Sequence, residues 1–291
     1  MIKTISLFLI TNFAVLLVLS FSLQIFNVAN MGFFLILALV IGMGGSFISL
    51  AMSKSMAKRS TGAQVIDSPS NNSERRLVEI IESLAIGAGI SKPEIAIYDS
   101  PDINAFATGI NRNNALVAVS TGLLDNMTEE EVEAVLAHEI SHVANGDMIR
   151  LSLIQGILNT FVMVFARIVG QIIDRVVFKN ERGVGIGYYL SIMIAEVVLG
   201  VLANIVVMWF SRKREFYADA GAARLVGKNK MIAALERLQT AHSDALPQQL
   251  TAFGINSSKA MGLFMSHPPL EARIDALVQE RFCLKARIMI N

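Results

Sequence analysis

The chain begins with two long uncharged apolar runs, residues 4–27 and 31–53. A helix needs about 20 apolar residues to cross a bilayer, and each run is long enough. No small-residue cleavage site follows the first run, and the second begins almost at once, so we expect a retained helical hairpin rather than a signal peptide. Lys3 precedes the hairpin, and Lys54 with two further basic residues follows it. The positive-inside bias therefore predicts that both ends of the hairpin face the cytoplasm.

Two further apolar segments lie between residues 149 and 210. The first contains Arg150 and Arg167, and the second contains Glu196. A charge near mid-bilayer is costly and usually faces protein or water, so Arg167 and Glu196 are candidates for a pair. These segments either span the membrane or form long helices only partly in lipid. The chain is therefore expected to have two to four transmembrane helices.

Between the apolar regions, residues 60–147 show the pattern of a soluble α+β unit. Apolar residues at helical spacing predict a helix within residues 73–90. Alternating apolar residues predict a strand within 93–100, and residues 104–121 read as two short strands around a central turn.

Composition strengthens the membrane interpretation. Hydrophobic residues make up 53% of the 291 residues and charged residues only 17%, against about 25% charged in typical soluble domains. The net charge of +1 leaves no basic excess for phosphates, so nucleic acid is not an expected partner. The single cysteine, Cys283, cannot form an internal disulfide, which fits a reducing compartment.

A well-signalled helix is predicted at the end of the soluble stretch. Thr128 and Glu131 form a T-x-x-E capping box, and acidic residues fill the first turn, which suits the helix dipole. Gly146 is a suitable stop. The residues between these signals are therefore expected to lie on a helix rather than in a loop.

This predicted helix carries His138, Glu139 and His142 in an H-E-x-x-H pattern. Histidines four residues apart lie on one helix face and can both bind one Zn²⁺. Zinc lowers the pKa of its bound water to about 7, and Glu139 is placed to accept the proton of that water. A pair of surface or core histidines is the alternative, but the spacing around a glutamate on a capped helix favours a catalytic metal. A structural zinc would need four protein ligands, usually with cysteines.

The third metal ligand must come from elsewhere in the chain. The extended H-E-x-x-H-x-x-G-x-x-H pattern is not met, because Asn145 and Met148 occupy its last two defined positions. Glu215 and Asp219 share a face of a second predicted helix, so Glu215 could bind zinc while Asp219 supports a ligand histidine. Spacing alone leaves equally open that both are solvated acids. If Glu215 joins His138, the two apolar segments between them must cross the membrane together or not at all.

Several stretches of the chain resemble one known family. The chain is similar to the membrane-bound zinc metalloproteases of the peptidase family that includes the prenyl-protein CAAX endopeptidases. The matching stretches are SPDINAFATG (100–109), AVSTGLL (118–124), AVLAHEISHVANGDM (134–148), MWFSRKREFYADAGAARLVG (208–227) and HPPLEARI (267–274). With the apolar segments in the same order, the resemblance covers nearly the whole chain.

The resemblance implies a fold and a ligand set. The expected fold is a mostly α membrane protein with an α+β zincin domain of the gluzincin type, which contains a small sheet with an edge strand. Glu215 is implied as the third ligand of one Zn²⁺ per chain. Asn104 and Ala105 are implied as substrate contacts by strand addition. His267 is implied either to polarise the scissile carbonyl or to support the site.

The expected domain organisation has four parts. Residues 1–59 form the transmembrane hairpin, and 60–147 form the first part of the peptidase domain. Residues 148–210 form the second apolar pair, and 211–291 complete the peptidase domain.

The resemblance further implies a bacterial inner-membrane endopeptidase whose site faces the cytoplasm. It would cleave cytosolic segments of misfolded or damaged membrane proteins, as quality control under stress. Its partners would be unfolded polypeptides and the bilayer. One alternative is a site-specific peptidase of the CAAX type. The other is a non-catalytic zinc-binding scaffold, which predicts loss of Glu139, and Glu139 is present.

Overall fold

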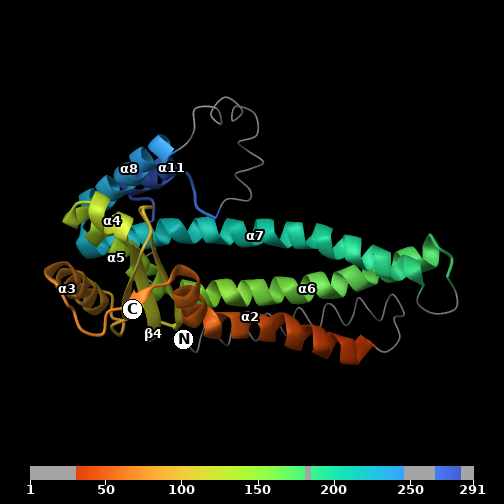
Figure 1. Ribbon diagram of the computed structural model, residues 1–291. Coiled ribbons are helices and arrows are strands. Elements are labelled where there is room, and N and C mark those ends of the chain that lie inside the picture. The colour runs from red at the N-terminus through yellow and green to blue at the C-terminus, as the bar shows by residue number, and fades with distance from the viewer. Residues whose placement is uncertain (1–30, 181–184, 246–265, 283–291) are drawn as a thin grey trace. The chain divides into compact units, whose positions relative to one another are not determined.

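The computed structural model describes residues 31–180, 185–245 and 266–282 and divides into two compact units. Among these residues, one unit contains 31–49 and the described part of 151–207, and the other contains Leu50–Arg150 and the described residues from Met208 onward. Figure 1 shows the helices and strands along the chain. The first predicted apolar helix, residues 4–27, lies outside the described residues.

Three long apolar helices dominate the described chain. They are α2 (Met31–Thr61), α6 (Asp147–Val176) and α7 (Ile186–Val226). By length and composition, Ala38–Thr61 of α2 and the whole of α6 and α7 are candidate membrane spans. Large apolar side chains of α7, including Met193, Val197 and Leu202, are exposed, as expected of a surface that faces lipid.

In the first unit, the described helices approach one another closely, and an ion pair links two of them. Gly42 of α2 lies so near α6 that an added Cβ would be 2.9 Å from the backbone nitrogen of Thr160. Such small-residue contacts are typical of helices that pack in membranes. The suggested pair of Arg167 and Glu196 is present, with Nη1 and Oε1 3.1 Å apart. The pair joins α6 to α7.

The second unit contains the expected small sheet. Its strands are β1 (Gln64–Val65), β2 (Glu94–Tyr98), β3 (Ala105–Asn111) and β4 (Asn114–Ser120), in the order β1-β2-β4-β3. The β2–β4 pair is parallel, and the other two pairs are antiparallel. Strand β3 is therefore an edge strand among the described residues, as predicted.

Further described helices contribute to the main core, which covers one face of this sheet. They are α3 (Asn72–Gly87), α4 (Thr121–Asn126), α5 (Glu129–Asn145), α8 (Lys228–Ala245) and α11 (Leu270–Val278). Val117 and Val119 of β4 pack with Leu136 and Ile140 of α5 in the main core. Leu116 and other alternate residues of β4 belong to a smaller cluster on the other face. Strand β4 is thus buried on both faces, which places α5 firmly against the sheet.

Helix α5 has both of its predicted end signals. The Thr128 side chain accepts from the Glu131 backbone, and the Glu131 side chain accepts from the Thr128 backbone, which completes the capping box. Gly146 ends the helix at φ 68°, a left-handed conformation that favours glycine. Because α6 starts at the next residue, the chain changes direction sharply beside the H-E-x-x-H motif.

Candidate metal centre

The two histidines of α5 point their Nε2 atoms toward one another. The Nε2 atoms of His138 and His142 are 3.1 Å apart, and the rings are perpendicular. This arrangement follows from the four-residue spacing, which stacks the two side chains on one face of the helix. The face turns toward α7.

Glu215 of α7 completes a three-ligand group. Its Oε2 lies 3.5 Å from Nε2 of His138, and its Oε1 lies 3.3 Å from Nε2 of His142. Four ligands around a metal at about 2.0–2.1 Å are separated from one another by roughly 3.3 Å in a tetrahedron. The donor atoms therefore fit a single metal ion. Among the described residues this is the one such group with donors within 4.8 Å of one another.

Each histidine uses its other ring nitrogen to bond a buried carboxylate. Nδ1 of His138 lies 2.9 Å from Oδ1 of Asp219, and Nδ1 of His142 lies 2.8 Å from Oδ2 of Asp147. These bonds favour the tautomer in which Nδ1 carries the proton and Nε2 is left for a metal. Sequence reasoning singled out Asp219 but missed Asp147. The available signal was an aspartate five residues after His142, just past Gly146.

The same hydrogen bonds shift the histidine pKa values. Burial alone would lower the pKa of His142, but its bonds to Asp147 and Glu215 outweigh burial and raise that pKa to about 10. Burial is likewise outweighed at His138, whose pKa is raised by its bonds to Asp219 and Glu215. Because a metal binds the unprotonated ring nitrogen, protons compete with a metal at this site.

A glycine lets α7 approach α5 at this point. Gly221 of α7 faces Ser141 of α5, and an added Cβ would lie 2.6 Å from the Ser141 hydroxyl oxygen. Any larger residue would push the helices apart. The close approach brings Glu215 and Asp219 within reach of the histidines.

A cleft of about 810 Å³ opens beside the ligands. Glu139 lines it with His138 and Glu215, and so do Asn104 and Ala105 of the edge-strand region. The remaining lining is largely apolar and includes Leu123, Val135, Met231, Leu235 and Leu238.

His267 also lines the cleft. Its Nδ1 is 2.8 Å from Oε2 of Glu215, and its side chain is 63% exposed. Of the sequence-predicted site residues, all but His142 and Asp219 thus line this one cleft. His142 lies beside His138, and Asp219 lies behind His138 and is buried. The remaining histidine, His242, has no described side chain.

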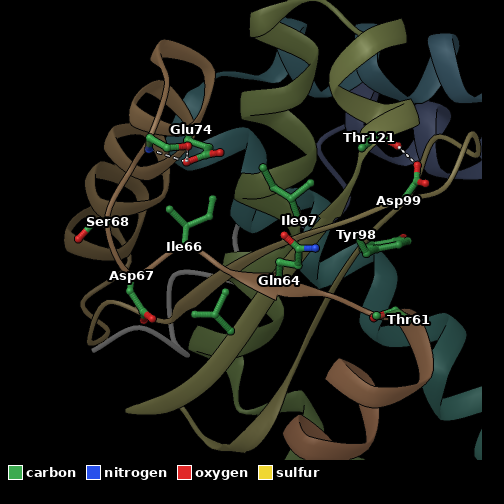
Figure 2. Close-up of a pocket in the computed structure, with 13 residues that line it drawn as sticks. Thr61, Gln64, Ile66, Asp67, Ser68, Glu74, Ile97, Tyr98, Asp99 and Thr121 are labelled. Carbon is green, nitrogen blue, oxygen red and sulfur yellow. Dashed lines mark hydrogen bonds between the residues drawn. The ribbon is translucent and has the colours of Figure 1, made fainter.

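A second cavity, of about 540 Å³, lies at the β1 edge of the sheet (Figure 2). Gln64 and Ile66 line it, together with Glu74, Tyr98 and Thr121. The Glu74 carboxylate accepts from Ser70, and the described lining includes neither histidine nor cysteine. The described lining of this cavity therefore lacks the two histidines that characterise the group of His138, His142 and Glu215.

Comparisons with known proteins identify the family of the chain. The model of peptidase family M48 matches residues 71–281. The chain is 58% identical over 290 residues to "Protease HtpX homolog" of Nitrosomonas europaea, covering 95% of this chain and 99% of that protein. It is also 58% identical over 282 residues to "Protease HtpX" of Stenotrophomonas maltophilia strain K279a, covering 95% and 98%.

One solved structure shares the fold. The crystal structure of S. mikatae Ste24p matches with a TM-score of 0.61 at 19% identity. The match covers 95% of this chain and 65% of that chain, so this chain spans about two thirds of its length. At this identity the likeness concerns the fold alone.

Proposed function

Because the chain belongs to peptidase family M48 and is a membrane metalloprotease, we propose that it is a zinc endopeptidase with His138, His142 and Glu215 as ligands. The observation that carries the proposal is the 3.1–3.5 Å spacing of their donor atoms. Two imidazole nitrogens and one carboxylate oxygen are a common ligand set of catalytic Zn²⁺, which keeps one position open.

Glu139 is the proposed general base. When held by His138, His142 and Glu215, Zn²⁺ would act as a Lewis acid and lower the pKa of a water at its open position. Glu139 lines the cleft beside His138 and accepts the proton of the attacking water. Glu139 then returns this proton to the amide nitrogen as the C–N bond breaks and the new carboxyl group forms.

Strand β3 is the proposed substrate-binding edge. The backbone N–H of Ser120 in β4 donates to the carbonyl oxygen of Asn104, so Asn104 and Ser120 form a hydrogen-bonded pair. Ala105 and Val119 are the next pair in register and therefore a non-bonded pair. Because hydrogen-bonded and non-bonded pairs alternate in antiparallel sheets, the polar backbone groups of Ala105 turn toward the outer edge. An extended peptide can add to this edge next to the metal, with Asn104 and Ala105 as contacts.

His267 is the proposed electrophile for the scissile carbonyl. Its contact with Glu215 and its exposed position bring an imidazole donor to the cleft rim. We expect His267→Ala to lower kcat by about 10²–10³, as for loss of one oxyanion donor, with metal retained. A variant that keeps wild-type kcat would exclude this role.

The proposed substrates are misfolded or damaged membrane proteins, cut in their cytosolic segments at the bacterial inner membrane. Strand addition reads the peptide backbone more than side chains, so selectivity is expected to be loose. Basic residues at the end of α2, Lys58 and Arg59, favour a cytoplasmic location for the residues that follow. We propose that 60–147 and 211–291 form one peptidase domain, and that 1–59 and 148–210 serve the membrane.

Two substitutions test the chemistry. Glu139→Gln should keep the metal and lose casein cleavage, because proton transfer and ligation are separate tasks. His138→Ala should lose both. Equal cleavage by wild-type enzyme and Glu139→Gln, or full zinc content in His138→Ala, would refute the assignment.

Substrate class is tested with the purified wild-type enzyme in lipid. A destabilised membrane protein should be cut much faster than its folded parent, and a prenylated CAAX peptide should not be preferred over either. Cleavage confined to the prenylated peptide would instead favour the site-specific processing function.

A further inference from the structure

Arg273 of α11 is a buried cation that the ligand set leaves without a role. The residue is only 6% exposed. Its Nε donates to Oδ2 of Asp219 at 2.8 Å, and its Nη2 donates to Oδ1 at 2.6 Å. Its Nη1 lies 3.5 Å from Oε2 of Glu215. The guanidinium therefore forms a two-pronged bond with one buried carboxylate and reaches the next.

The electrostatics of α7 require such a cation. Glu215 and Asp219 are one turn apart and 2% and 1% exposed. Buried carboxylates are costly unless a charge or hydrogen bonds compensate them. A metal would compensate Glu215 directly, whereas the charged partner of Asp219 is Arg273. Arginine suits this position because its planar fork matches both oxygens of a carboxylate, which a lysine cannot do.

The fork also fixes the orientation of the Asp219 carboxylate. The oxygen that receives Nη2 of Arg273, Oδ1, is the oxygen that lies 2.9 Å from Nδ1 of His138. A carboxylate on its own rotates easily about its last torsion. With both oxygens held by Arg273, Oδ1 stays aimed at Nδ1, and the His138 ring keeps Nε2 directed at the metal position.

We propose that Arg273 is a positioning residue for the metal centre and acts on His138 through Asp219. The inference rests on the proposed function, because it takes His138 as a metal ligand. Arg273 also lines the cleft, and its Nη2 lies 3.4 Å from Nδ1 of His138. In this role, however, it acts by fixing the carboxylate of Asp219, which the fork holds at 2.6 and 2.8 Å. It sets how tightly and in what geometry the metal is bound.

The main rival is a purely structural role, in which Arg273 only fastens α11 to the unit. Helix α11 has separate apolar anchors for that purpose. Leu277 is 3% exposed, and Phe282 after the helix stacks on Phe216 of α7 at 5.1 Å between ring centroids. These anchors line a small pocket next to Asp219, but their apolar side chains cannot hydrogen-bond its carboxylate. Weakening an anchor therefore disturbs α11 while the bonds between Arg273 and Asp219 stay available, which separates the two roles experimentally.

The test uses the full-length protein in detergent, with Zn²⁺ affinity from chelator competition and the visible absorption of bound Co²⁺ as a report on ligand geometry. Arg273→Gln should lower Zn²⁺ affinity by about 10–100-fold and change the Co²⁺ spectrum. Arg273→Lys should fall between wild type and Arg273→Gln. Arg273→Gln should cost less metal affinity in an Asp219→Asn background than in wild type, because the path through Asp219 is already broken and only the contact with Glu215 remains to be lost.

Leu277→Ala is the matched control. It should lower thermal stability while Zn²⁺ affinity and the Co²⁺ spectrum stay as in wild type. The inference is overturned if Arg273→Gln keeps both metal properties, if its effect multiplies with that of Asp219→Asn, or if Leu277→Ala reproduces it. Should Arg273→Gln fail to fold, Arg273→Lys takes its place. Its Zn²⁺ affinity and Co²⁺ spectrum are then compared with and without Asp219→Asn.

Failure of this inference is distinguishable from failure of the proposed function. If His138→Ala loses zinc while the Arg273 variants bind it normally, only the role of Arg273 is wrong. If His138→Ala keeps full zinc content, the metal centre itself is wrong.

Discussion

At the scale of single residues, the second histidine depends on an aspartate that never reaches the metal position. Asp147 is 2% exposed and bonds Nδ1 of His142. Its backbone oxygen accepts from Nη1 of Arg214 at 2.9 Å, which fixes the start of α6 against α7. The aspartate is thus held rigidly, and the histidine ring with it.

We predict that Asp147→Ala lowers metal affinity by about 10–100-fold, the usual cost of losing such an outer partner. Asp147→Asn should lose less, because its amide oxygen can still accept from Nδ1. Chelator competition measures both. Glu133→Ala is the control, since Glu133 lies on α5 but bonds Lys230, and its affinity should match wild type. Wild-type affinity in Asp147→Ala would remove Asp147 from the site.

The sequence predicted some site residues and not others for a physical reason. His138, Glu139 and His142 lie on one continuous helix, so their spacing alone fixed their relative placement. Asp147 was missed because, on a continuous helix, a residue five positions on lies about 140° away around the axis. The left-handed turn at Gly146 breaks that rule. The assignment of Glu215 needed the family resemblance, because its spacing allowed two interpretations.

At the scale of elements, the distance between α5 and α7 sets the metal centre. Gly221→Ala should force the helices apart, because its Cβ would meet both the hydroxyl oxygen and the Cβ of Ser141, at 2.6 and 2.9 Å. We expect weaker metal binding and lower thermal stability, measured by chelator competition and thermal unfolding.

The matched control for this change is the double variant Gly221→Ala with Ser141→Gly, which removes the opposing side chain. It should recover metal affinity. Its thermal stability should recover only in part, because glycine at position 141 has a lower helix propensity than serine. If the double variant binds metal no better than Gly221→Ala, the steric explanation is incorrect.

The edge of β3 gives a second prediction at this scale. A peptide substrate with one backbone amide methylated should lose cleavage at alternate positions, because only every second amide can bond an edge strand. Replacing side chains at the same positions should have smaller effects. A scan of kcat/KM with singly N-methylated peptides measures this, and a flat profile would contradict strand addition.

The sequence predicted the elements that show a clear apolar period or clear end signals, whereas the helices α8 and α11 were not predicted. The capped helix α5, the helix α3 and strands β2 to β4 all lie where the patterns indicated. Helix α4 and strand β1 were not predicted, since six and two residues are too few to show a period. The start of α3 shifted slightly, because Asn71 accepts from Glu74 and caps the helix ahead of Ser73.

At the scale of the whole molecule, the site constrains how the chain crosses the membrane. His138 precedes α6, and Glu215 lies in the last part of α7, after its apolar stretch. Since both bind one metal in the proposed function, the residues before α6 and those at the end of α7 share one side of the bilayer. If the apolar parts of α6 and α7 span the bilayer, they therefore cross as a pair, and we predict that Lys179, between them, lies on the opposite side.

Cysteine labelling tests this arrangement in spheroplasts. Three variants are made in a Cys283→Ser background, and each carries one cysteine at an exposed position, which is Lys92, Thr240 or Lys179. A membrane-impermeant maleimide should label Lys179→Cys in intact spheroplasts, because this residue lies between α6 and α7, and should label the other two only after lysis. If Lys92→Cys and Thr240→Cys are labelled before lysis and Lys179→Cys is not, the orientation in the membrane is the reverse of the proposed one. Opposite results for Lys92→Cys and Thr240→Cys would separate the two halves of the metal centre and exclude the ligand set.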